Sequence, residues 1–177
     1  MIETPRLILR PWRDSDFAPF AELCADPVVM RFLRGPLTRE QSDAYVRRVQ
    51  QHWADHGFGK WVVEAPGVAS FIGAIGLSNV QYEASFTPAV EIAWRLHQRF
   101  WGQGYATEAA RAAMQDGYTR VGLREIVAVT ALGNIPSQRV MERLGMTRTI
   151  EYDHPLLAED SPLRRHILYR QKAPAKT

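Results

Sequence analysis

Two glycines in a short aromatic segment give this sequence its clearest chemical signal. Residues 99–107 (RFWGQGYAT) lie between a predicted strand and the start of a predicted helix. A helix N-terminus leaves backbone N–H groups without intrahelical acceptors and carries a positive partial charge. Gly102 and Gly104 have no side chain to keep a ligand away from these groups, and Arg99 adds a cation that can pair with a phosphate. The segment therefore predicts a binding site for a phosphate-bearing ligand.

Two other phosphate-binding motifs fit this segment less well. The Walker A string Gly-x4-Gly-Lys-Ser/Thr does not occur in the chain. A dinucleotide fingerprint needs a third small residue at position 107, where Thr107 stands, and it usually belongs to an early strand–helix–strand unit. On the glycines alone, an ordinary strand-to-helix turn remains an equal alternative.

Composition places the chain among compact proteins of one domain. It has 177 residues, of which 46% are hydrophobic and 23% charged. The net charge of +3 is too small to indicate nucleic-acid binding and suits a small polyanionic ligand. We expect one domain over residues 1–172 and a flexible tail over residues 173–177.

Cysteine and histidine usage gives no sign of a disulfide or a metal site. Cys24 is the only cysteine, lies in an apolar stretch, and is predicted to be a small core residue. His52 and His56 can share a helix face, but no HExxH motif accompanies them. The first residues do not read as a secretion signal, and no apolar run approaches the roughly 20 residues that span a bilayer. We expect a cytoplasmic protein that does not enter the membrane.

The elements that must position the glycine segment alternate irregularly along the chain. Asp14 and Ser15 are expected to cap a helix that reaches Cys24, and Asp26-Pro27 to end it. Thr38 and Gln41 form a predicted capping box. Strands are expected at 6–10, 60–65, 70–80, 89–96, 125–131, 146–153 and 166–170, with helical segments at 28–33, 38–55, 106–121 and 136–144. The order predicts an α+β (mixed α/β) fold rather than a doubly wound sheet.

The glycine segment resembles a family motif. Arg99-x-x-Gly102-x-Gly104-x-Ala106 is similar to the Q/R-x-x-G-x-G/A motif of the GNAT superfamily of N-acetyltransferases. The strand segment 91–94 (EIAW) and Asn134-x-x-Ser137 stand at the spacing that this family uses. The segments 4–10 (TPRLILR) and 26–29 (DPVV) resemble its RimJ/RimL-type branch, which includes acetylases of ribosomal-protein N-termini. The resemblance implies a central, mostly antiparallel, splayed sheet flanked by helices.

The resemblance implies acetyl-CoA as cosubstrate. In the family, loop amides hold the pyrophosphate of CoA, and the pantetheine arm enters a gap beside the strand that precedes the loop. The cofactor-binding residues that this implies are Ile92, Ala93, Trp94, Arg99, Phe100, Trp101, Gly102, Gln103, Gly104, Tyr105, Ala106, Thr107, Asn134 and Ser137. For Trp101 we favour a role in capping the core, and Asn134 has a helix N-cap as its alternative role.

The resemblance also implies two catalytic residues. Glu91 matches the carboxylate that many relatives use as the base for the incoming amine. Many relatives carry a tyrosine acid where this chain has Met141, and Ser137 is the residue that RimJ/RimL-type relatives are thought to use instead. A solvated or ion-paired Glu91, and a Ser137 that only contacts CoA, remain open alternatives.

The implied function is transfer of an acetyl group from acetyl-CoA to a primary amine, directly in a ternary complex. Alternatives are a non-catalytic module that binds or senses acyl-CoA and, further off, a dinucleotide-binding protein. The acceptor is a protein N-terminus or a small-molecule amine, chosen by residues near 32–59 and 154–165. Glu159 and Asp160 lie there and could attract a cationic amine, although charged loops are usually solvated. No nucleic-acid or membrane partner is expected, and a homodimer is compatible with the sequence.

Overall fold

A computed structural model describes residues 1–175, so the last two residues of the predicted tail lie outside the described residues. The strands are β1 Ile2–Glu3, β2 Ile8–Arg10, β3 Lys60–Ala65, β4 Ala69–Asn79, β5 Val90–Leu96, β6 Glu125–Ala131, β7 Thr147–Asp153 and β8 Arg165–Lys172. The helices are α1 Phe17–Ala25, α2 Pro27–Met30, α3 Arg39–His56, α4 Tyr105–Asp116 and α5 Ile135–Arg143, with short turns η1 Asp14–Asp16, η2 Gln98–Phe100 and η3 Gly117–Val121.

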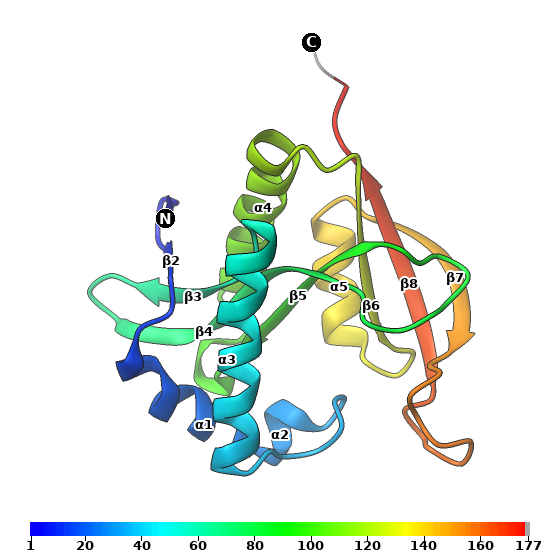
Figure 1. Ribbon diagram of the computed structural model, residues 1–177, viewed down its shortest axis with the longest axis horizontal. Coiled ribbons are helices and arrows are strands. Elements are labelled where there is room, and N and C mark those ends of the chain that lie inside the picture. The colour runs from blue at the N-terminus through cyan, green and yellow to red at the C-terminus, as the bar shows by residue number, and fades with distance from the viewer. Residues whose placement is uncertain (176–177) are drawn as a thin grey trace.

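All eight strands form one twisted sheet in the order β1-β2-β3-β4-β5-β6-β8-β7. Every neighbouring pair is antiparallel except β5 and β6, which run parallel near the middle of the sheet (Figure 1). The predicted α+β fold with a mostly antiparallel sheet is therefore confirmed.

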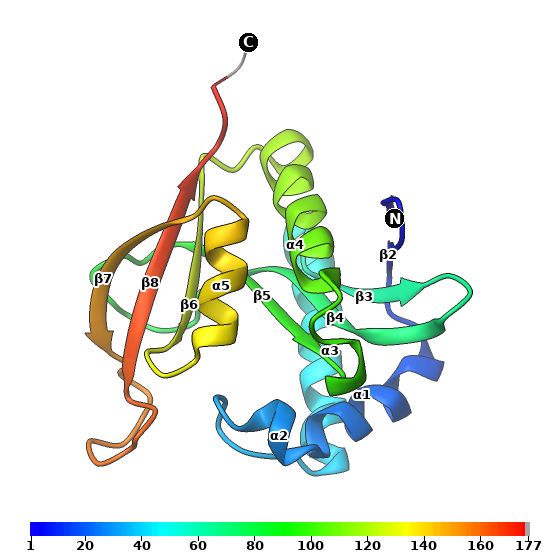
Figure 2. The same cartoon turned by 180° about the vertical axis from the view of Figure 1, so that it is seen from behind.

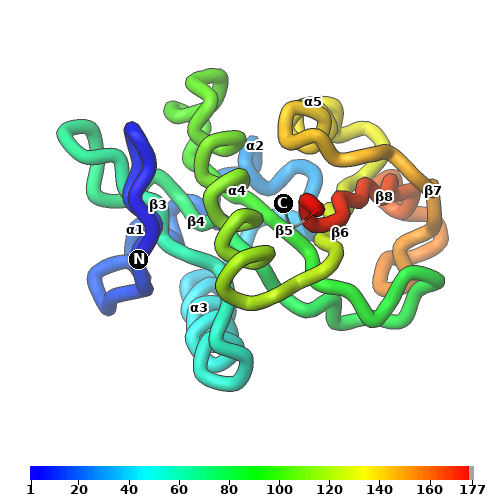
Figure 3. The backbone as a smooth tube through the Cα atoms, turned by 90° about the horizontal axis from the view of Figure 1, so that it is seen from above, coloured from blue at the N-terminus to red at the C-terminus, as the bar shows by residue number. Residues whose placement is uncertain are grey.

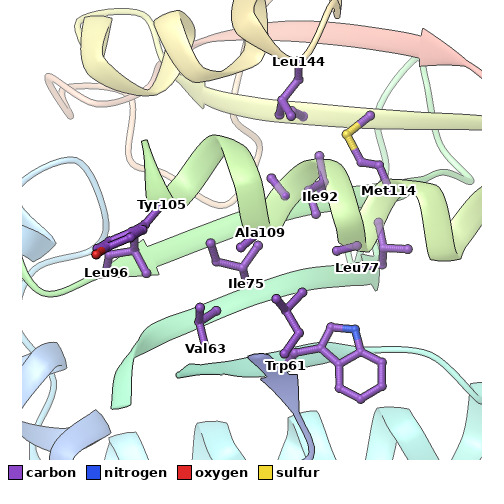
Figure 4. Close-up of a cluster of buried hydrophobic side chains, with 14 of the residues drawn as sticks. Trp61, Val63, Ile75, Leu77, Ile92, Leu96, Tyr105, Ala109, Met114 and Leu144 are labelled. Atoms are coloured by element: carbon purple, nitrogen blue, oxygen red, sulfur yellow. The ribbon is translucent and has the colours of Figure 1, made fainter. Parts of the chain in front are cut away.

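Helices cover both faces of the sheet. Figures 1 and 2 show α1 and α3 on one face and α4 and α5 on the other, and Figure 3 shows the sheet between these layers from above. Each face has its own core. One core packs α1 and α3 against β3 and β4 and includes the buried Cys24. The other packs α4 and α5 against the sheet (Figure 4).

Small side chains let α4 lie close to the sheet. Ala109, Ala110 and Ala113 are buried on the face of α4 that meets β4 and β5. Figure 4 shows Ala109 and Met114 beside Ile75 and Ile92 of those strands. The alanine stripe predicted this packing, and the packing fixes the start of α4 at the end of β5.

Local sequence signals set the ends of α3 and α2. Thr38 Oγ1 accepts from Gln41 N, and Gln41 Oε1 accepts from Thr38 N, so the predicted capping box is confirmed. Asp26 ends α1 and also caps α2, since its Oδ1 accepts from Val28 N at 2.8 Å.

The predicted N-cap of the first helix was wrong. Asp14 and Ser15 lie within η1, and α1 starts after Asp16, whose side chain makes no capping bond to it. The Asp16 carboxylate instead accepts two bonds of 2.8 Å from the buried Arg10 guanidinium. A charge-assisted bidentate pair is stronger than a single cap bond, and it draws Asp16 into the core.

Most predicted strands agree with the structure to within one or two residues, and 60–65 and 125–131 agree at both ends. The two-residue β1 at the sheet edge was missed, because so short a strand leaves no alternation to detect. Of the predicted helical segment 28–33, only the part up to Met30 is helical, and it belongs to α2. In the described part of the chain, no helix has both the length and the apolarity that crossing a membrane requires.

Candidate functional site

The glycine segment turns tightly from β5 into α4. After η2 the backbone takes a left-handed conformation at Gly102 (φ 74°) and again at Gly104 (φ 82°), the residue just before α4. Only glycine adopts this region without steric cost. Glu108 N donates to Gly104 O, while the N–H groups of Tyr105, Ala106 and Thr107 come too early in α4 for an intrahelical acceptor. The start of α4, a helix of 12 residues, thus has free N–H groups of the kind that bind anions at helix N-termini.

The N-terminal segment holds this turn in place. Glu108, in the first turn of α4, accepts from Thr4 Oγ1 at 2.7 Å and from Arg6 Nε at 2.7 Å. Arg6 Nη1 also donates to the Gln103 carbonyl at 2.9 Å, and its guanidinium stacks 4.8 Å from the centre of the Tyr105 ring. Burial raises the pKa of the Glu108 carboxyl, but the bonds from Thr4 and Arg6 outweigh burial and lower it. This clamp accounts for the Thr4-x-Arg6 pattern, whose role sequence reasoning had not identified.

Beside the turn, the parallel strands β5 and β6 separate. They are in register at a single position, Glu91 opposite Val127, whereas β5 pairs with β4 along its whole length. A cavity of about 420 Å³ lies in this region, lined by β5, the glycine turn, β6, α5 and the segment around α2. The sheet is therefore splayed at its centre, as the resemblance implied.

The charges that line this first cavity are all positive. Its charged lining residues are Arg31, Arg95, Arg139 and Arg143, and within residues 1–175 no aspartate or glutamate lines it. Apolar side chains, among them Phe32, Val129 and Met141, form much of the remaining wall. An anionic ligand with an extended, partly apolar body fits these walls. Arg31, Arg139 and Arg143 were missed by sequence reasoning, because isolated arginines outside a motif give no signal.

Most of the predicted cofactor-binding residues line this cavity. They are Ile92, Ala93, Trp94, Phe100, Trp101, Gly102, Gly104, Tyr105, Ala106, Thr107, Asn134 and Ser137. Arg99 and Gln103 do not: Arg99 is exposed and stacks on the Phe100 ring at 4.8 Å, and the Gln103 side chain donates to Arg99 O. The preferred core-capping role of Trp101 was wrong, since Trp101 is 39% exposed and anchored through its indole N–H to Leu96 O.

The start of α5 presents Asn134 and Ser137 to the same cavity. Asn134 Nδ2 donates to Thr130 Oγ1 at 2.8 Å, and its Oδ1 accepts from Ser137 N at 3.4 Å. Asn134 is therefore an N-cap that also lines the cavity. Ser137 is half-buried in the first turn of α5, where the positive end of the helix favours negative charge.

A second cavity of about 470 Å³ lies on the α3 face of the sheet. Its walls come from α3, the adjoining strands β3, β4 and β5, and the segments 79–82 and 154–156. Glu91 lines this second cavity rather than the first. Glu91 and Ile92 are consecutive residues of β5, so both cavities adjoin this one strand.

Polar groups surround Glu91 in the second cavity. Ser78 lies opposite it in β4 and donates from Oγ to Glu91 Oε1 at 3.2 Å. Lys60 Nζ donates to the Tyr45 hydroxyl at 3.0 Å. Burial lowers the pKa of the Lys60 ammonium, but Tyr45 and Glu91 outweigh burial and raise it. Burial raises the pKa of the Tyr45 phenol, and the charges of Lys60 and Arg95 outweigh it and lower this pKa. Sequence reasoning had assigned roles to none of these polar neighbours.

Two histidines on the cavity wall are held neutral. His52 Nδ1 lies 2.8 Å from Phe58 O, and Asn79 N donates to His52 Nε2 at 3.1 Å. A ring that donates through Nδ1 and accepts through Nε2 carries one proton, and burial lowers the pKa of His52 further. Burial, His166 and Arg34 together lower the pKa of His154 to about 4. Neither histidine adds charge to the cavity near neutral pH.

The acidic loop residues that might have attracted an amine lie elsewhere. Glu159 and Asp160 are exposed and are not part of the wall of the second cavity. The loop reaches this cavity through His154 and Leu156 instead. Across the described residues, no group of three His, Cys, Asp or Glu side chains is arranged to hold a metal ion.

Together the two cavities can hold two substrates next to one strand, β5. The first offers helix N–H groups, arginines and a hydroxyl to an anionic ligand, and the second offers a carboxylate to a group that must lose a proton. Group transfer across the gap beside β5 is chemistry that this arrangement supports.

Comparison with known proteins finds a family match over most of the chain. The family described as "Acetyltransferase (GNAT) domain" matches residues 6–147. YkkB of Bacillus subtilis is 33% identical over 81% of this chain and 83% of its own length. The FsC-acetyl coenzyme A-N(2)-transacetylase of Aspergillus fumigatus is 32% identical over 87% of this chain and 69% of its own length.

Solved structures share the fold over nearly the whole chain. A GNAT-family acetyltransferase from Bacillus anthracis superimposes with a TM-score of 0.80 at 24% identity, covering 97% of this chain and 98% of its own. The spermidine N-acetyltransferase of Vibrio cholerae, solved with CoA and spermine, gives a TM-score of 0.76 at 18% identity and covers 96% and 97% of the two chains.

Proposed function

We propose a mechanism and substrate-binding sites for this chain. The chain belongs to the GNAT acetyltransferase family and is an acetyl-CoA-dependent N-acetyltransferase. In the proposal, acetyl-CoA occupies the first cavity, the amine occupies the second, and the acetyl group passes directly between them. The RimJ/RimL-type pattern at residues 4–10 and 26–29 supports a place in that branch of the family.

One observation carries the proposal. Glu91 lines the second cavity and Ile92 lines the first, so a single strand borders both substrates where β5 separates from β6. Backbone N–H groups on the β6 side of β5 have no registered partner in β6 after Glu91. These groups are placed to bind the thioester carbonyl and the negative charge that develops on its oxygen.

The two candidate catalytic side chains divide the proton transfers. Glu91 would take the proton from the ammonium of the acceptor, directly or through a water, so that the free amine can attack. Ser137, at the positive end of α5, would give a proton to the departing thiolate and take up the remaining proton of the attacking nitrogen as the tetrahedral intermediate collapses. No covalent intermediate on the enzyme is needed, and Cys24 is buried and lines neither cavity.

The test is a binding and turnover experiment with a designed loop variant. We expect acetyl-CoA and CoA, but not NADH, to raise the melting temperature, because a ligand at about 100 times its Kd adds about 2.7 kcal/mol of stability. Gly104→Trp should abolish this shift, because residue 104 has φ 82° and lines the first cavity. We also expect release of CoA thiol when amines are supplied.

Two results would contradict parts of this proposal. Stabilisation by CoA without turnover of any amine would favour the acyl-CoA-sensing alternative. Stabilisation by NADH alone would favour dinucleotide binding.

A domain over residues 1–172 and a cytoplasmic location belong to the same proposal. The single unpaired cysteine supports the cytoplasmic location.

A further inference from the structure

We propose that the amine acceptor is a small molecule that also carries an acidic group, and that Arg34 and Arg48 bind this group. The inference rests on the proposed function, because it takes the second cavity as the acceptor site. It concerns which class of amine enters, and neither the family nor the relatives described above assign this.

The charges on the wall of the second cavity favour a zwitterionic acceptor over a polycation. The wall carries three side chains that are cationic at neutral pH, Arg34, Arg48 and Lys60, and two carboxylates, Glu91 and Asp55. Lys60 keeps its proton, because its pKa is raised. A polyamine that placed one ammonium at Glu91 would bring its other ammonium groups close to these cations. The like charges would repel, which is unfavourable.

Arg34 and Arg48 are available to bind an anion. Neither makes an ion pair or a side-chain hydrogen bond anywhere in residues 1–175, although many other arginines of the chain do, such as Arg10 and Arg120. Arg48 leans on the Tyr45 ring, with its guanidinium 5.9 Å from the ring centre. A guanidinium with free N–H groups is suited to a carboxylate or phosphate.

The two carboxylates of the cavity have different tasks. Asp55, on the exposed part of α3, accepts a hydrogen bond of 2.7 Å from Gln51 of the same helix. Glu91 is half-buried on the sheet and, in the described part of the chain, its side chain accepts from Ser78 alone, so it can still receive the ammonium. The cavity thus has one place for an amine at the sheet and arginines for an acid farther out.

The size and the remaining walls favour a small acceptor. A volume of about 470 Å³ lies in the range of small-molecule sites. His52 and His154 are neutral near pH 7 and form uncharged walls, together with Tyr82 and Leu156. These walls can cover the body of a small amino acid while its two charged groups reach Glu91 and the arginines.

The experiment compares matched amines with and without an acid. Turnover is measured for phenylalanine against 2-phenylethylamine, for phosphoethanolamine against ethanolamine, for spermidine, and for a neutral dipeptide amide. We expect the acid-bearing member of at least one pair to have a kcat/KM about tenfold or more above its partner. The first pair reports on a carboxylate and the second on a phosphate, so the two sources of the acid are distinguished.

Variants assign the effect to the two arginines. Arg34→Gln and Arg48→Gln should each raise KM for the preferred acidic amine about tenfold and leave kcat and the KM for its neutral partner nearly unchanged. Arg47→Gln is the matched control, since Arg47 is exposed on the same helix but does not line the cavity. Added salt should weaken the effect in the wild type.

A direct measurement of binding distinguishes a failure of this inference from a failure of the proposed function. With CoA present, calorimetry should detect the acidic amines binding more tightly than their neutral partners, whether or not turnover occurs. Tighter binding without turnover of any amine would sustain the acid-binding site and contradict the proposed transferase mechanism. Preferred turnover of spermidine, the dipeptide amide or the neutral partners would overturn the inference and leave the transferase mechanism standing.

Discussion

Glu91 lines the second cavity from the sheet, and within residues 1–175 only Ser78 hydrogen-bonds to its side chain. We expect Glu91→Gln to lower kcat about a hundredfold or more, because a general base contributes on the order of 10²–10⁴ in rate. The KM for acetyl-CoA should stay within a few fold, since Glu91 does not line the first cavity. Steady-state kinetics with both substrates varied measures this.

Glu125→Gln is the control for that change. Glu125 is also a strand carboxylate, but it pairs with Arg170 and lines neither cavity. Full activity in Glu91→Gln would show that another group, or solvent, accepts the ammonium proton. Loss of activity in both variants would point to a general effect on the sheet.

Ser137 can be tested apart from the helix cap that it shares. Its backbone N–H, not its hydroxyl, completes the Asn134 cap, so Ser137→Ala keeps that bond. We expect kcat to fall while CoA binding, measured by calorimetry, changes little. Asn134→Ala should instead destabilise the fold by about 1 kcal/mol, because it removes the cap. An unchanged kcat in Ser137→Ala would leave Ser137 with a binding role alone.

Sequence reasoning found the residues that belong to motifs and missed those that do not. The glycines stand where a tight turn requires them, and Asn134 and Ser137 stand at the spacing of the family that the chain resembles, so they can be recognised from the sequence. Arg31, Arg139 and Arg143 reach the first cavity from different elements, and only the folded chain brings them together. The same holds for Lys60 and Tyr45, whose hydrogen bond joins β3 to α3.

At the scale of elements, the turn before α4 depends on a left-handed backbone at Gly104. A Cβ at this residue would also lie 3.3 Å from Arg6 Nη2. We expect Gly104→Ala to cost about 1 kcal/mol of unfolding free energy and to weaken acetyl-CoA binding several fold. Chemical denaturation and calorimetry measure the two effects.

Gly122→Ala is the matched control for the turn. Gly122 has φ 78°, nothing lies within 4 Å of its Cβ position, and it lines neither cavity. It should lose similar stability without any change in acetyl-CoA affinity. Equal affinity losses in both variants would mean that the strain acts through global stability and not through the turn.

The Arg6 clamp is an interaction between elements far apart in the sequence. Arg6→Gln should raise the KM for acetyl-CoA several fold, since the Gln103 carbonyl and Glu108 lose their shared partner beside the turn. Stability should fall by less than about 1 kcal/mol, because the pair is partly exposed. Arg148→Gln, which breaks the exposed pair with Glu151 on β7, is the control for loss of a surface charge. An unchanged KM in Arg6→Gln would show that the turn keeps its shape without the clamp.

The positions of helices and strands were predicted better than their exact ends and than the contacts between them. The 3.6-residue alanine stripe and the β-branched runs identified α4 and β6, since periodicity is local. The helix start predicted at Asp14 and Ser15 was wrong because the chain there is held by the ion pair of Asp16 with the buried Arg10, a tertiary contact that propensity does not contain. The separation of β5 and β6 came from the family resemblance and not from the pattern of either strand.

For the whole molecule, histidine burial predicts loss of stability in mild acid. Burial lowers the pKa of His52, His97, His154 and His166, that of His154 to about 4. Unfolded histidines titrate near 6.5, so between this pH and about 4 the unfolded chain binds protons that the folded protein does not. The free energy of unfolding should therefore fall as pH falls through this window.

Melting temperature against pH measures this effect. We expect a decline of several degrees from pH 7 to pH 5, and a shallower decline in His154→Asn. His56→Asn is the control, because His56 is exposed on α3. A flat profile over this range would show that the histidines titrate alike in both states.

The single register position between β5 and β6 has a consequence for how the molecule could be divided. The strands β1 to β5 and the strands β6 to β8 are each antiparallel and each continuous in sequence, and the chain crosses between them once, around residues 122–124. A polypeptide nicked at that crossing would give two fragments, one with β1 to β5 and α1 to α4 and one with β6 to β8 and α5, and the two share one core. Both fragments contribute to the wall of the first cavity, so acetyl-CoA would bridge them. Bound acetyl-CoA would therefore add to the shared core in holding the two halves together, so reassembly of the fragments should depend on the concentration of this cosubstrate.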